Sequence, residues 1–360
     1  MTSLLDPITV GALSLPNRIF MSPLTRLRAP GNVANNIMAE HYRLRASAGL
    51  IISEGIPIMP EAVAYPHVPG IWSESQVAGW RGVTNAVHEA GGRIFAQLWH
   101  VGRVSNPALA GTELPVAPSS IAAAGHIPFT RPKQSYVEPH ALTESEIQDR
   151  VAAFRSAAVN AQRAGFDGVT IHGANGYLLD QFLQDRSNHR SDKYGGSVEN
   201  RARFMLEVVD AAVSVWGAGR VSINLAPRSP SHDVGDSDPA QTFRYVAREL
   251  GKRHLAFLYI RETPGPDALL QDIKQAFSGV CVVNDGFDID MAKEAVATGA
   301  ADAVGFGRLY IANPDLVERI RVGALLNTIN SETIYDIENP GSVGYNDYPR
   351  LNEKRFAGVV

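Results

Sequence analysis

The 360-residue chain has very little cysteine and no long apolar segment. Its one cysteine, Cys281, cannot form an intrachain disulfide, which fits a reducing compartment. No apolar run approaches the roughly 18 residues of a membrane-spanning helix. The first ten residues, MTSLLDPITV, lack the charged and apolar regions of an export signal. We therefore expect a cytoplasmic protein without a membrane partner.

Strong charge and metal-binding patterns are also missing. The formal net charge is −4, and no basic run is interleaved with aromatic residues. This balance gives no reason to expect a nucleic acid or another polyanion as a partner. The histidines show no HxH or HxxxH pair near a predicted strand end, so we expect no metal site.

Alternating strand-like and helix-like runs dominate what is present. Hydrophobic residues make up 45% of the chain, and no low-complexity linker divides it. Such alternation is typical of a parallel sheet, and about eight repeats predict a single (β/α)8 (TIM) barrel domain over 1–360. The strands are expected at 18–22, 50–54, 93–98, 168–171, 221–225, 255–260, 280–283 and 303–306.

Two segments fall outside this alternation. Residues 6–15 are expected to form a hairpin ahead of the barrel. Residues 101–141, after the third strand, are a long excursion rich in Pro, Ala, Ser and Gly, which is typical of a lid. Thr143 and Glu146 then form a capping-box pattern that predicts the start of the next helix.

Three polar side chains follow the fourth predicted strand within six residues: His172, Asn175 and Tyr177. The active site of such a barrel lies at the carboxyl ends of its strands. His172 and Asn175 can donate hydrogen bonds to an oxygen that gains negative charge, and Tyr177 can supply a proton. This set predicts catalysis at that strand end.

Glycine-rich turns follow the seventh and eighth predicted strands. They read Asn284-Asp285-Gly286-Phe287 and Gly305-Phe306-Gly307-Arg308. Loops at these positions often form the phosphate site of a barrel, because glycine lets backbone N–H groups approach the phosphate closely. Arg308 could bind the same phosphate through two hydrogen bonds.

Two long motifs, HGANGYLLDQFL from His172 and SNHRSDKYGGSVENRARF from Ser187, resemble the signature of the Old Yellow Enzyme family. The resemblance spans residues 3–351 and includes GYNDYP near the C-terminus. It implies an ene-reductase that holds flavin mononucleotide (FMN) tightly but non-covalently. NADPH or NADH would reduce the flavin, and an activated alkene would then be reduced in the same site.

The resemblance also assigns residues. His172 and Asn175 would hold the substrate oxygen, and Tyr177 would protonate the substrate carbon. The implied substrate pocket adds Tyr65, Trp99 and Tyr345. The implied cofactor contacts are Pro23, Leu24, Thr25, Gly55, Gln97, Asn224, Asp285, Gly286, Gly307 and Arg308.

One position departs from the family pattern. Most members carry an arginine on the fifth strand, where its charge stabilises the reduced flavin, whereas this chain has Asn224 there. Asparagine donates hydrogen bonds but carries no charge. We hypothesise that Arg228, just past the strand, supplies the charge instead.

Other functions remain open at this stage. A flavin-binding barrel with low turnover could serve in ligand binding or redox sensing, which Asn224 would suit. A cofactor-free or metal-dependent barrel lyase is a third possibility. The physiological substrate, the choice between NADPH and NADH, and the oligomeric state (monomer or homodimer) are not indicated by the sequence.

Overall fold

The computed structural model describes residues 1–338 and 341–351. Within these residues, eight parallel strands close into a barrel, and each pairs with its neighbours in chain order. This confirms the predicted (β/α)8 barrel. The strands are β3 (Ile19–Met21), β4 (Leu50–Pro57), β5 (Ile94–Trp99), β8 (Gly168–His172), β9 (Val221–Leu225), β10 (Phe257–Arg261), β11 (Cys281–Asn284) and β12 (Ala303–Phe306).

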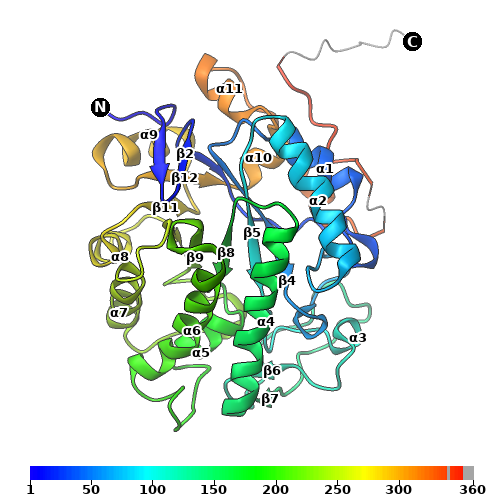
Figure 1. Cartoon of the computed structure of the whole chain (residues 1–360), viewed down its shortest axis with the longest axis vertical. Helices are drawn as coiled ribbons and strands as arrows, with labels where there is room; N and C mark the ends of the chain where they lie inside the picture. The colour runs from blue at the N-terminus through cyan, green and yellow to red at the C-terminus, as the bar shows by residue number, and fades with distance from the viewer. Residues whose placement is uncertain (339–340, 352–360) are drawn as a thin grey trace.

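Helices surround the barrel on the outside (Figure 1). The helices between and after the strands are α1 (Asn36–Arg43), α2 (Glu74–Glu89), α4 (Glu144–Arg163), α5 (Leu178–Leu183), α6 (Val198–Trp216), α7 (Pro239–Gly251), α8 (Leu270–Phe277), α9 (Ile289–Thr298), α10 (Arg308–Ala312) and α11 (Leu316–Val322). Short 3-10 helices lie at Pro30–Asn32, Pro60–Ala62, Ala218–Arg220, Ser231–Asp233 and Ser331–Thr333. None of the helices in the described residues is long and apolar enough to cross a membrane.

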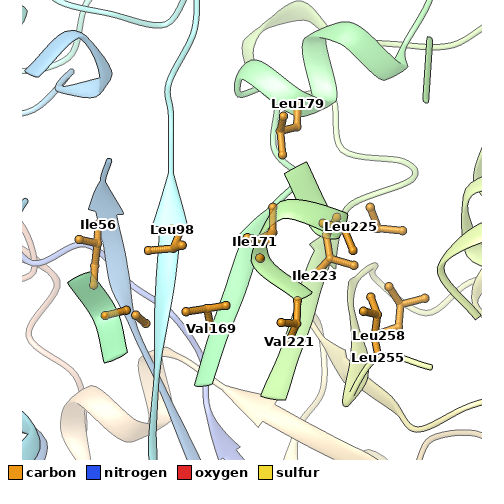
Figure 2. Close-up of a cluster of buried hydrophobic side chains, with 14 of the residues drawn as sticks. Ile56, Leu98, Val169, Ile171, Leu179, Val221, Ile223, Leu225, Leu255 and Leu258 are labelled. Atoms are coloured by element: carbon orange, nitrogen blue, oxygen red, sulfur yellow. The ribbon is translucent and has the colours of Figure 1, made fainter. Parts of the chain in front are cut away.

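Apolar and polar side chains alternate along the barrel strands β8 and β9, because successive residues of a strand point to opposite faces of the sheet. Val169 and Ile171 of β8 lie beside Val221 and Ile223 of β9 in a buried apolar cluster (Figure 2). The residues between them are polar, and the hydroxyls of Thr170 and Ser222 hydrogen-bond at 2.8 Å. The same alternation places the last inward-facing residues of each strand at the mouth of the barrel.

The predicted N-terminal hairpin forms from β1 (Ile8–Val10) and β2 (Leu13–Leu15). Its apolar side chains pack in one cluster with Phe20, Phe95 and Phe257 from inside the barrel. The turn residue Gly11 has φ +55°, and a Cβ there would lie 2.2 Å from the carbonyl oxygen of Gly219. The hairpin therefore closes the barrel at the end opposite its mouth.

The predicted excursion contains helix α3 (Pro107–Ala110) and a small parallel sheet of β6 (Val116–Ala117) and β7 (His140–Ala141). In Figure 1 these elements lie far from the N-terminal hairpin, at the other end of the view. The capping box at the start of α4 is confirmed, with both reciprocal hydrogen bonds of Thr143 and Glu146 present.

Candidate active site

A cavity of about 830 Å³ opens at the carboxyl ends of the barrel strands. Its size suits a cofactor together with a small substrate. It brings together every site residue expected from the sequence except Tyr345. The members are Pro23, Leu24, Thr25, Gly55, Tyr65, Gln97, Trp99, His172, Asn175, Tyr177, Asn224, Asp285, Gly286, Gly307 and Arg308.

The turn from β8 into α5 positions the three candidate catalytic side chains. His172 ends the strand, and Tyr177 immediately precedes the helix. Asn175 has φ +59°, a left-handed conformation that asparagine tolerates better than most residues. The Gly176 N–H donates to the buried carboxyl of Asp180 at 2.8 Å. This hydrogen bond holds the turn against the helix that follows it.

Two of the three side chains, His172 and Tyr177, pack against Trp99 in one aromatic cluster. The His172 and Tyr177 rings meet edge to face with centroids 5.0 Å apart, and Tyr177 meets Trp99 in the same way at 4.9 Å. The Tyr65 and Tyr177 hydroxyls are 3.1 Å apart. The Tyr177 phenol is therefore fixed at its ring and at its oxygen.

Burial sets the protonation states of this group. Loss of solvent lowers the pKa of His172 to about 3, and the positive charges of Arg261 and His232 add to the effect. Burial likewise raises the pKa of Tyr177 above its ordinary value. At neutral pH the imidazole is a neutral donor and the phenol keeps its proton, as the chemistry expected from the sequence requires.

Several polar atoms in the cavity wall match the edge of a flavin ring. Gln97 Nε2, Asn224 Oδ1 and His172 Nδ1 are buried but find no hydrogen-bond partner among the described residues. Buried polar groups in native proteins are nearly always paired, so these atoms indicate a bound heterocycle or substrate. A Cβ at Gly55 would lie 2.7 Å from the Trp99 ring, so this position admits no side chain.

The opposite end of the cavity suits a phosphate. Asp285 and Gly286 both have positive φ, +82° and +75°, which gives a tight turn of exposed backbone N–H groups. The Arg308 guanidinium makes no hydrogen bond or ion pair with the part of the chain described here. The residues present therefore fit FMN at both its ring and its phosphate.

The expectation for Tyr345 is wrong. Its ring is fully buried and stacks on His41 at a centroid distance of 3.8 Å, with the Arg26 guanidinium over its ring at 4.8 Å. Tyr335 lines the cavity instead, together with Phe129 from the excursion. The GYNDYP motif therefore anchors the C-terminal segment rather than the substrate.

The hypothesis for Arg228 is also wrong. Its guanidinium pairs with the Glu262 carboxylate at 2.6 Å and does not line the cavity. The arginine that enters the cavity from this side is Arg261, at the end of β10. Sequence reasoning missed it, although a charged residue at the carboxyl end of a barrel strand is a usable signal.

A second missed group lies below the mouth. Tyr259, two residues before Arg261, hydrogen-bonds Ser22 at 2.6 Å, and the Asn284 amide donates to Ser22 at 3.1 Å. These side chains line the cavity floor between β3, β10 and β11. The sequence predicts Tyr259 only as part of a strand, because an aromatic residue in a buried strand usually packs in a core.

Comparisons with known proteins agree with this geometry. Residues 3–327 match the model of the NADH:flavin oxidoreductase / NADH oxidase family. A Leishmania infantum protein named "Probable flavin mononucleotide-dependent alkene reductase" is 43% identical over 360 residues, covering 96% of this chain and 97% of its own.

Solved structures are equally similar. The Old Yellow Enzyme homologue from Zymomonas mobilis superposes with a TM-score of 0.93 at 43% identity, covering 97% of this chain and 99% of its own. Morphinone reductase in complex with tetrahydroNAD gives 0.93 at 45% identity, covering 98% of each chain. The chain therefore belongs to the NADH:flavin oxidoreductase / NADH oxidase family, the Old Yellow Enzyme family.

Proposed function

We infer that the protein is an FMN-dependent NAD(P)H oxidoreductase that reduces the activated C=C bond of α,β-unsaturated carbonyl or nitro compounds. The observation that carries this conclusion is the convergence of His172, Asn175 and Tyr177 on one cavity whose wall fits a flavin. The alkene-reductase name of the Leishmania relative and the tetrahydroNAD complex of morphinone reductase support it.

FMN would be held at three places. Gln97 and Asn224 offer unpaired polar atoms to its ring, and Thr25 lies at the same wall. The backbone of Asp285 and Gly286, with Gly307 and Arg308, would bind its phosphate. When bound, the flavin supplies the hydride that the alkene accepts.

His172 and Asn175 would bind the carbonyl or nitro oxygen of the substrate. Both donate hydrogen bonds as neutral groups, so they stabilise negative charge that appears on that oxygen during the reaction. Because the site is preorganised by the β8–α5 turn, little reorganisation is needed at that moment. These hydrogen bonds draw electron density towards the oxygen. The alkene carbon farther from the carbonyl or nitro group therefore becomes more electrophilic and accepts hydride more readily.

Tyr177 would deliver a proton from its Oη to the other alkene carbon. Its raised pKa keeps the proton in place until the substrate carbon becomes basic enough to take it. The neighbouring Tyr65 hydroxyl, at 3.1 Å, holds the phenol oxygen in position. A phenol is therefore a suitable proton source here at neutral pH.

The substrate wall is aromatic, which suits flat conjugated acceptors. Tyr65 and Trp99 stack at 5.7 Å with their planes 13° apart, and Phe129 and Tyr335 complete the wall. Both NAD(P)H and the alkene would use this one cavity, so we propose ping-pong kinetics.

A visible spectrum taken through one turnover tests the proposal. The purified protein is titrated anaerobically with NADPH and then with 2-cyclohexenone. We expect a flavin absorption band that bleaches with NADPH and returns with the enone. A colourless protein that remains so after FMN is added would contradict the assignment. A bound flavin that resists reduction would instead favour the low-turnover function.

A further inference from the structure

Arg261 places a positive charge beside the proposed oxygen-binding donors. It ends strand β10, in which Phe257 and Tyr259 pack inside the barrel. Alternation along the strand puts Arg261 on the same inward side, one layer nearer the mouth. The side chain is 37% exposed, and it lines the cavity.

The guanidinium is held from two sides. Its Nη1 donates to Asn175 Oδ1 at 2.7 Å, and its Nε lies 3.2 Å from the Asp285 carboxylate. Because arginine only donates hydrogen bonds, the Asn175 atom that faces it must be the amide oxygen. The Asn175 amide nitrogen is then left to donate into the cavity that Asn175 lines.

The cavity-lining residue of the neighbouring strand β9 carries no charge. Asn224 of β9 is the register partner of Tyr259, and Arg261 lies two residues beyond Tyr259. Arg261 also lies close enough to His172 to lower the pKa of that imidazole. The Arg261 guanidinium of β10 therefore acts on both residues that are proposed to donate hydrogen bonds to the substrate oxygen.

Resting on the proposed roles of His172 and Asn175, we propose that Arg261 is a positioning residue for the substrate-oxygen site. It fixes the orientation of the Asn175 amide, and its charge favours ligands whose oxygen is anionic or becomes so. Acceptors that form a discrete oxyanion before the carbon is protonated, an enolate or a nitronate, gain most from this arrangement.

Calorimetric binding of pentafluorophenolate to the oxidised FMN-loaded protein tests the proposal without turnover. The probe has a single oxygen, which is anionic at neutral pH. We expect Arg261→Met to weaken its binding about tenfold and Arg261→Lys to recover part of the loss. Arg244→Met removes the same charge from an exposed pair with Asp272, and it should bind the probe like the unmodified protein.

A double-mutant cycle with Asn175→Ala separates the possible failures, because residues that act together are not additive. We expect Arg261→Met to cost much less in the Asn175→Ala background than alone. Equal costs in both backgrounds would overturn the positioning of Asn175 by Arg261, and no cost from Arg261→Met would overturn its charge effect as well; either result leaves the proposed function intact. No cost from Asn175→Ala would overturn the proposed oxygen site, and the role of Arg261 with it.

Discussion

At the scale of a single residue, the Tyr177 hydroxyl is the proposed proton donor to the alkene carbon. Tyr177→Phe removes the proton and leaves the ring packed against Trp99 and His172. We expect alkene turnover to fall by about 100-fold, the lower end of what a positioned acid contributes. Reduction by NADPH should not change, since it needs no proton from the phenol. Stopped-flow absorbance resolves the two half-reactions.

Tyr194→Phe is the matched control for this change. Tyr194 is a buried tyrosine whose hydroxyl bonds to Glu207, outside the cavity. It should leave both half-reactions unchanged. A Tyr177→Phe protein that slows reduction by NADPH as much as alkene turnover would show that the phenol acts on packing, not as an acid.

His172 makes stability depend on pH, because burial lowers its pKa to about 3. The folded protein keeps the imidazole neutral between pH 7 and pH 5, whereas the unfolded chain takes up a proton near its ordinary pKa of about 6.5. Stability is therefore lost as the pH falls through this range, by about 2 kcal/mol from this residue. Urea unfolding at pH 7 and pH 5 measures the loss.

His172→Asn keeps a donor and removes the titration. We expect this variant to lose about 2 kcal/mol less than the unmodified protein between pH 7 and pH 5. Equal losses in the two proteins would mean that His172 takes up its proton in the folded state as readily as in the unfolded one.

Most site residues could be predicted individually, because the family motif and the carboxyl end of a predicted strand indicated the same residue. Gln97 and Asn224 stand on strands whose carboxyl ends had to meet at the barrel mouth. Arg261 carried the strand-end signal but belonged to no motif, and Tyr345 belonged to a motif but to no strand end. Whether a C-terminal tyrosine faces the cavity or stacks on His41 depends on long-range packing that a sequence pattern does not contain.

At the scale of the element, the β8–α5 turn is the most important part of the site. Asp180 is fully buried, and its two oxygens accept from the Gly176 N–H and from the Gln184 amide at 2.8 and 2.7 Å. Gly176 has φ +73°, and a Cβ there would lie 2.4 Å from the Ser231 carbonyl oxygen. The turn is therefore fixed by one carboxyl and by one position without a side chain.

Asp180→Ala should loosen this turn. It leaves the Gly176 N–H and the Gln184 amide without their acceptor, which costs about 1–3 kcal/mol for each buried group. Asn175 and Tyr177 lie on either side of Gly176, so we expect kcat for alkene reduction to fall at least tenfold. Steady-state kinetics and urea unfolding measure the two effects.

Asp180→Asn is the conservative comparison. One amide oxygen can still accept from the Gly176 N–H, and Gln184 can rotate to accept from the new amide. We expect most activity to remain. An inactive Asp180→Asn protein that is as stable as the unmodified one would point to a role for the carboxyl charge itself, beyond holding the turn.

Elements were predictable where periodicity and caps coincided, as at α4 and at the eight barrel strands. The inside of the excursion was not. Its two-residue strands β6 and β7 are too short to show any alternation, and the helix α3 spans only Pro107–Ala110. Such pieces are held by tertiary contacts, which no local pattern reveals.

For the whole molecule, two arginines after β3 bind the C-terminal segment to the barrel. Arg26 donates to the carbonyl oxygens of Ile334 and Gly344, and Arg28 donates to those of Thr333, Asp336 and Gly341. This places Tyr335 at the cavity. The contacts join residues about 300 positions apart in the sequence, which explains why the motif alone misplaced Tyr345.

Glu54, which accepts a hydrogen bond from the Arg26 N–H, is fully buried. Its ionisation therefore changes the free energy of unfolding of the whole protein. Burial raises its pKa to about 7, although the Arg26 N–H and charge act in the opposite direction. The stability that a raised carboxyl pKa contributes is complete below the unfolded value of about 4.5 and is lost as the pH rises through 7. Between pH 6 and pH 8 this loss is roughly 1 kcal/mol.

Glu54→Gln keeps one acceptor oxygen for the Arg26 N–H, and its amide N–H can donate to the Tyr42 hydroxyl oxygen, but it cannot ionise. We expect the unmodified protein to lose roughly 1 kcal/mol more than Glu54→Gln between pH 6 and pH 8. Urea unfolding of the FMN-loaded proteins at both pH values measures this difference. If the two proteins instead change equally in stability over that range, the Arg26 charge outweighs burial, and Glu54 is already ionised at pH 6 in the folded barrel.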